Sequence, residues 1–124
     1  MFWDSALIIR GVIRYVARIR IHPSYNPSVS NNFDVAVLTL SSPLVFSTKI
    51  RSIGLLSSRP AAGTNSVVSG WGSTSMGGTV QTGGPLTANG GLAGVVSFGY
   101  GCALAGYAGV YASVPELRSW ILAN

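Results

Sequence analysis

Short runs of apolar and β-branched residues, each closed by Gly, Pro, Ser or Asn, divide most of this chain and limit what it can fold into. This punctuation is typical of antiparallel strands joined by tight turns. Hydrophobic residues make up 48% of the chain and charged residues 9%, a balance that excludes a disordered protein. We therefore expect one all-β domain, with residues 35–40 as a buried central strand. The runs with this character are residues 35–40, 50–56, 67–71, 92–98 and 110–114.

The N-terminal stretch mixes apolar side chains with arginines and allows two interpretations. Arginines at every fourth position, starting from Arg10, would suit a cationic amphipathic helix. From Val16 onward, however, apolar residues alternate with Arg18 and Arg20, and β-branched residues are frequent, which favours a strand. The longest uncharged run here, residues 5–9, is too short for a signal peptide or a membrane-spanning helix. We expect a strand, no recognisable signal peptide and no membrane partner.

A net charge of +5, from eight Lys and Arg against three acidic residues, would be compatible with nucleic-acid binding. Four of the arginines lie in the first twenty residues, and no basic stripe interleaved with aromatic residues follows. The sequence therefore argues against a nucleic-acid partner. It also holds no metal-ligand cluster, phosphate-binding loop or cofactor motif, so we expect no metal site and no cofactor.

The C-terminal tail has a different pattern from the rest of the chain. Pro115 stands at a suitable first helical position and is followed by Glu116. Leu117, Trp120 and Ile121 then recur at the spacing of one helical face. The sequence predicts one short C-terminal helix, at residues 115–123, on an all-β body.

Seven phrases, in order along the chain, together resemble the chymotrypsin/trypsin-like serine proteases. The resemblance extends from about residue 19 to the C-terminus, whereas residues 1–18 match no motif and are left unassigned. Each phrase is weak alone, but seven in the family's order make coincidence an inadequate explanation. The phrases are IHPSYN (21–26), NNFDVAVLTLSSPLVF (31–46), VVSGWGST (67–74), GGPL (83–86), GVVSFGYGCA (94–103), GYAGVYASV (106–114) and LRSWI (117–121).

The resemblance implies two six-stranded β-barrels with a catalytic cleft between them, a peptide or protein substrate, and an extracellular location. Residues 19–124 would form an incomplete version of this double barrel. The end of the first barrel would run to about residue 60, and a partial second barrel would occupy residues 66–114. Only eleven positions separate Trp71 from Thr82, where the family has several strands and the floor of its specificity pocket.

The same resemblance assigns candidate catalytic positions. Asp34 aligns with the aspartate of the Ser-His-Asp triad, although an aspartate that caps local backbone amides would look the same. Thr82 stands at the nucleophile position, where a hindered secondary hydroxyl replaces the primary hydroxyl of serine. Val80, Gln81 and Gly83 form the neighbouring loop that would supply the oxyanion hole, and Val80 adds a Cβ where the family has glycine.

The base that the mechanism requires has no counterpart at its family position. His22 is the single histidine of the sequence, and we interpret it as an exposed turn residue that precedes a proline. Cys102 lacks the cysteine with which its family counterpart pairs, so it is a free thiol, an intermolecular partner or an inert buried residue.

A substrate-binding segment is also implied by the resemblance. Ser97, Phe98 and Gly99 would pair with the substrate backbone, and Gly99 and Gly109 would line a pocket. If no pocket forms, the same glycines are ordinary turn and strand-end residues.

These features predict a trypsin-like serine protease homologue that is catalytically inactive as written. Three alternatives stay open: an active protease completed by a second chain, a homologue that binds peptides or proteins without cleaving them, and a truncated product without its own function. Because deleted strands leave unpaired sheet edges, we also expect self-association.

Overall fold

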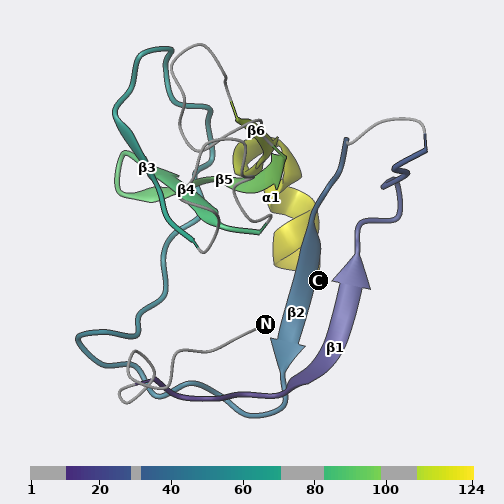
Figure 1. The fold of residues 1–124 in the computed structure, drawn as a ribbon, viewed down its shortest axis with the longest axis vertical. Helices are drawn as coiled ribbons and strands as arrows, with labels where there is room; N and C mark the ends of the chain where they lie inside the picture. The colour runs from purple at the N-terminus through teal and green to yellow at the C-terminus, as the bar shows by residue number, and fades with distance from the viewer. Residues whose placement is uncertain (1–10, 29–31, 71–82, 99–108) are drawn as a thin grey trace, which may run out of the picture.

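The computed structural model describes residues 11–28, 32–70, 83–98 and 109–124. Its strands form two separate antiparallel sheets, and one helix lies between them (Figure 1). The elements, in chain order, are β1 (Val16–Ile21), β2 (Ala36–Leu40), β3 (Ser66–Val68), β4 (Pro85–Ala88), β5 (Gly91–Phe98), β6 (Val110–Ser113) and α1 (Val114–Ala123).

The first sheet consists of β1 and β2 alone. Its register places Ile19 opposite Leu38 and Ile21 opposite Ala36, so these side chains share one face. The strand prediction for this part of the N-terminal stretch is confirmed. The prediction that residues 35–40 are buried is wrong, because Leu38 is 55% exposed. Few contacts join this sheet to the other described helix and strands, so its apolar face stays open.

The second sheet has the order β3-β4-β5-β6, with β3 and β6 at its edges. A two-residue turn at Asn89 and Gly90 joins β4 to β5, and both residues have positive φ, 50° and 78°. Positive φ at both central positions is characteristic of the type I′ turn, which Asn-Gly favours. β4 was not predicted from the sequence, although the Asn-Gly dipeptide is a usable signal for the hairpin.

The C-terminal helix forms where it was predicted. Ser113 is the N-cap residue, and Pro115 stands in the first turn, where a missing amide hydrogen costs nothing. The helix packs against β5 and β6, with Val114 and Leu117 buried. The buried apolar side chains among the described residues are Ala88, Ala93, Val96, Val114 and Leu117.

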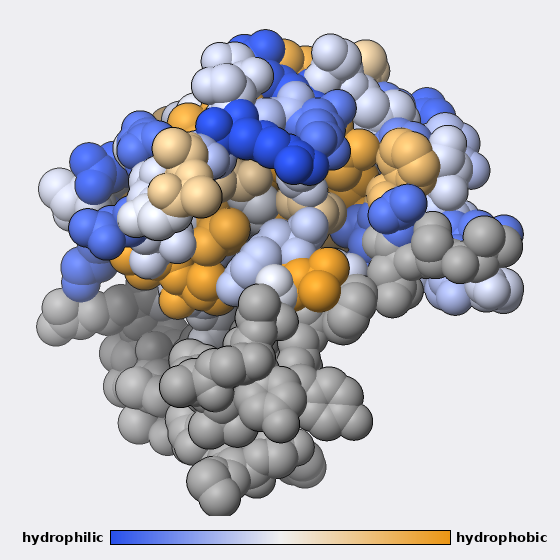
Figure 2. Space-filling view, turned by 90° about the horizontal axis from the view of Figure 1, so that it is seen from above, coloured by the Kyte–Doolittle hydropathy of each residue, from blue (hydrophilic) through white to orange (hydrophobic). Residues whose placement is uncertain are grey.

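The described residues therefore form a mostly β fold with one short helix. Within the described residues the strands form open sheets and no closed barrel. Many apolar side chains stay at the surface, and Figure 2 shows them interspersed with polar ones on the face it presents. No helix in the described ranges has both the length and the apolar character needed to span a bilayer.

Candidate functional site

A hydrogen bond between Asp34 and Ser97 joins the segment before β2 to β5. The Ser97 hydroxyl donates to Oδ2 of Asp34 over 2.6 Å, although the two residues are 63 positions apart in the sequence. Ser97 is 4% exposed and Asp34 is half-buried. A short bond from a hydroxyl to a carboxylate is among the stronger hydrogen bonds in proteins. The structure thus brings together two residues that the sequence assigned to the catalytic and substrate-binding groups.

The backbone that positions Asp34 is unusual. Phe33, immediately before it, has a φ of 58°, a left-handed conformation that bulky residues rarely adopt. Two main-chain hydrogen bonds hold this turn: the amide of Val35 donates to the carbonyl of Phe33, and the amide of His22 donates to the carbonyl of Val35. Backbone strain of this kind, typically about 1–3 kcal/mol, often occurs at functional positions.

His22 is held by two aromatic rings. Its imidazole stacks on Phe33 with centroids 4.7 Å apart and lies 4.7 Å from the ring of Trp120 at a tilt of 47°. Its Nδ1 accepts a hydrogen bond from the amide of Ser24. His22 lies beside a turn, as predicted, but it is half-buried instead of exposed because the rings enclose it. In the described part of the chain, no hydrogen bond links this imidazole to Asp34.

The Gly-Gly-Pro segment is bound to β5 next to Ser97. Gly83 donates its amide to the carbonyl of Val96, and the carbonyl of Gly84 accepts from the amide of Val96. Gly83 has a φ of 91°, which suits glycine. Since its amide is already bonded to Val96, Gly83 cannot at the same time donate that hydrogen to a bound oxyanion.

The remaining predicted site residues are only partly described. Val80, Gln81, Thr82, Gly99 and Cys102 lie outside the described residues. The backbone of Phe98 is described and faces Val110 in β6. The space beside Gly109 is occupied, because a Cβ at that position would lie 2.8 Å from the hydroxyl of Tyr111.

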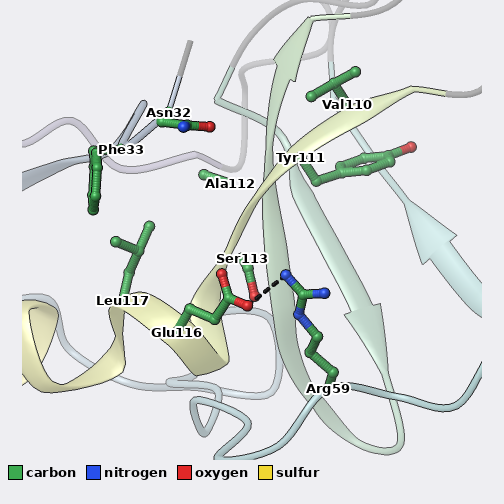
Figure 3. A pocket seen from close by; sticks show the side chains of 9 residues that line it. All are labelled: Asn32, Phe33, Arg59, Val110, Tyr111, Ala112, Ser113, Glu116 and Leu117. Carbon is green, nitrogen blue, oxygen red and sulfur yellow. Dashed lines mark ion pairs between the residues drawn. The ribbon is translucent and has the colours of Figure 1, made fainter. Parts of the chain in front are cut away.

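A cavity of about 490 Å³, which the sequence motifs did not predict, opens beside β6 (Figure 3). Arg59 and Glu116 form an ion pair at its rim, and both side chains are more than half exposed. A second cavity of about 350 Å³ shares Arg59, Tyr111 and Ser113 with it. Arg59 lies in a segment without a family motif, so no sequence signal pointed to it. Within the described ranges, no three His, Cys, Asp or Glu side chains gather closely enough to hold a metal ion.

Comparison with known proteins gives consistent matches. A family model described as trypsin matches residues 10–82 and 80–121. Trypsin alpha-4 of Lucilia cuprina is 36% identical over 166 positions, which cover 98% of this chain and 63% of that protein. Trypsin beta of Drosophila erecta is 37% identical over 169 positions, covering 99% and 65%. Trypsin alpha-3 of Lucilia cuprina is 36% identical over 157 positions, covering 90% and 94%.

The chain thus spans less than two thirds of the length of the first two of these relatives. An alignment of 166 positions with a chain of 124 residues also leaves at least 42 aligned positions without a residue in this chain. The two matched stretches meet at residues 80–82, which indicates a discontinuity at the predicted nucleophile position.

Proposed function

Because this chain belongs to the trypsin family, we propose that it is a non-catalytic homologue that binds peptides or proteins through its remaining cleft and does not cleave them. In this proposal residues 19–124 are the partial protease domain and the protein acts outside the cell. The observation that most supports this proposal is how His22, the single histidine of the sequence, is held by its neighbours. A serine-protease mechanism needs an imidazole that takes the proton of the nucleophile while a carboxylate orients it.

His22 does not meet that requirement. Its two ring contacts fix the imidazole between Phe33 and Trp120, and its Nδ1 is engaged by the amide of Ser24. The carboxylate of Asp34, which would have to orient a base, accepts the hydroxyl of Ser97. Asp34 and Ser97 therefore hold β5 to the segment before β2, and neither supplies the general base. Loss of such a base typically lowers turnover by about 10²–10⁴-fold.

The nucleophile and the oxyanion hole are impaired as well. Thr82 has an internal position and cannot use its own terminal amine as a base, as N-terminal threonine nucleophiles do. Val80 and Gln81 replace residues that the family uses in the oxyanion loop, and Val80 adds a Cβ where the backbone must turn tightly. A lost oxyanion donor costs about 10²–10³-fold in turnover.

The substrate-binding strand is the part of the cleft that we propose is retained. Ser97, Phe98 and Gly99 would add the backbone of a bound peptide to the end of β5. The hydrogen bond from Ser97 to Asp34 supports the role, because it anchors the start of this segment against the first sheet. The phenol of Tyr111 lies beside Gly109 and narrows the predicted pocket. This favours a ligand that binds through its peptide backbone.

The test is an attempt to restore activity. We expect Thr82→Ser to leave both peptide hydrolysis and labelling by a fluorophosphonate undetectable, because a serine hydroxyl without a base stays protonated. A full-length trypsin, assayed with the same pooled peptides and probe, is the positive control. Turnover in the Thr82→Ser variant that is lost on Asp34→Ala would overturn the proposal and show that a base is recruited. Labelling only after a second chain is added would favour the completed-protease alternative.

A further inference from the structure

The open edge of the four-stranded sheet borders the 490 Å³ cavity (Figure 3). Its walls come from two distant parts of the chain: Phe33 precedes β2, whereas Ala112 in β6 and Leu117 in α1 are close together in the sequence. We propose that this surface binds an extended segment of another polypeptide. The segment adds as a strand beside β6 and places a large apolar side chain in the cavity. This surface is separate from the predicted substrate segment at the end of β5.

The main chain of β6 carries hydrogen-bonding groups on the side that faces away from β5. The amide and the carbonyl of Val96 both bond to the Gly83–Gly84 segment, on the β4 side of β5. Val96 faces Tyr111 across the β5–β6 pair, so this is a position where the two strands do not exchange hydrogen bonds. The amide and carbonyl of Tyr111 therefore point to the outer side of β6. No strand among the described residues pairs with β6 on that side.

Apolar side chains around the cavity are only partly buried. Figure 3 shows the ring of Tyr111 pointing away from Phe33 and Leu117, which leaves the space beside Ala112 open. Phe33 is 42% exposed and Val110 is 41% exposed, so apolar surface around the cavity is not yet buried. A volume of 490 Å³ lies within the usual range of ligand sites, about 300–1,000 Å³. Burial of a large apolar side chain there is favourable by the hydrophobic effect.

The charges at the rim set a further condition. Arg59 and Glu116 pair with each other, so the described residues that line the cavity offer no unpaired charge for a charged ligand to neutralise. The bound segment is therefore defined by two features: its main chain pairs with that of Tyr111, and it carries an apolar side chain that enters the cavity. A charged side chain placed in the same space would lose hydration without gaining an opposite charge.

A second copy of this chain fits the cavity less well than another polypeptide. If two copies paired through antiparallel β6 strands, the residues opposite each other would project from the same face of the sheet. The cavity-facing residues of one copy would then lie opposite the cavity-facing residues of the other. These residues are Val110 and Ala112, which are too small to fill 490 Å³. The relatives, by contrast, carry at least 42 more aligned positions than this chain. In the described four-stranded sheet, only the edge strands β3 and β6 can pair with a further polypeptide segment of this kind.

The binding experiment uses a fluorescein-labelled, acetylated and amidated peptide of about seven residues, a typical strand length, in which Thr and Leu alternate. We expect saturable binding to the whole chain by fluorescence anisotropy. Hydrogen exchange at the Tyr111 amide, followed by NMR, should slow at least about tenfold when the peptide is present, because a main-chain bond forms there. A matched peptide with alternate amides N-methylated on the edge that faces β6 should bind at least about tenfold more weakly.

Two variants test the cavity itself. Ala112→Phe fills the space and should weaken binding of the Thr-Leu peptide at least about tenfold, whereas Val67→Phe, on the opposite edge strand, should leave binding unchanged. Unchanged binding in Ala112→Phe, or protection that appears at β3 instead of Tyr111, would overturn the proposal. So would protection of Tyr111 that rises with chain concentration and needs no peptide, because that result identifies a second copy as the occupant.

If Ala112→Phe does not fold, the comparison between the two peptides on the unmodified chain decides the question. Mass spectrometry of the recovered peptide separates this inference from the proposed function. A cleaved peptide would refute the non-catalytic proposal and leave strand addition at β6 supported by the exchange data. An intact peptide without Tyr111 protection would refute strand addition alone.

Discussion

At the scale of single residues, the hydrogen bond from Ser97 to Asp34 connects the predicted catalytic and substrate-binding segments. The family motifs allowed both residues to be predicted as site residues, but their direct bond depends on two segments 63 positions apart. The enclosure of His22 was not predictable either, because Trp120 approaches it from the C-terminal helix. Sequence patterns identify residue types at short spacing, whereas these contacts arise only when the elements pack.

A double-mutant cycle tests the strength of the contact between Asp34 and Ser97. We expect Ser97→Ala to lower the free energy of unfolding by about 1–3 kcal/mol, because it leaves a half-buried carboxylate without its donor. In an Asp34→Asn background the same change should cost less, with a coupling above about 0.5 kcal/mol. Urea denaturation measures both values. Ser66→Ala, at an exposed position of β3, is the control and should change stability by less than about 0.5 kcal/mol.

At the scale of elements, strand and helix positions followed from local pattern more reliably than burial did. Residues 92–98 and 110–114 were predicted close to the bounds of β5 and β6, and the helix begins one residue before its predicted start. The run at 35–40 was apolar enough to suggest a central strand, yet β2 pairs only with β1. Burial depends on what packs against a strand, and that information is not contained in the strand's own residues.

The packing of the Gly-Gly-Pro segment against β3 gives a prediction at this scale. A Cβ at Gly84 would lie 2.5 Å from the carbonyl oxygen of Ser69, a rigid backbone atom. We expect Gly84→Ala to destabilise the chain by about 1–3 kcal/mol, the usual cost of forced overpacking. Gly54→Ala is the matched control, since nothing lies within 4 Å of its added Cβ. Thermal unfolding followed by circular dichroism compares them, and equal midpoints for the two variants would contradict the close approach.

At the scale of the whole molecule, the open sheets leave a large surface. Among the described residues, large apolar side chains of both sheets stay exposed, including Ile19, Leu38 and Val67. The resemblance to the trypsin-like proteases predicted the type of fold correctly. A barrel closes only when its two edge strands pair with each other, and the two sheets of the described residues have edge strands that do not pair in this way.

This surface leads us to predict self-association, and the apolar face of the first sheet is where we expect it. Ile19, Ile21 and Leu38 lie on one face and are between 55% and 62% exposed. Arg18 and Arg20 lie on the other face of β1, where like charges would disfavour pairing of two β1 edges. The two apolar faces are therefore expected to pack against each other, and sedimentation velocity should show a mass that increases with concentration.

Leu38→Lys places a charge at the centre of that face and should shift the chain toward monomer by at least about tenfold in dissociation constant, since an unpaired charge cannot be buried without a large penalty. Val45→Lys is the control, because Val45 is 77% exposed and lies outside both sheets, so its replacement should leave association unchanged. A chain that sediments as a stable monomer over a wide concentration range would contradict the prediction. Association that both variants weaken equally would place the contact elsewhere, because only Leu38 belongs to the face in question.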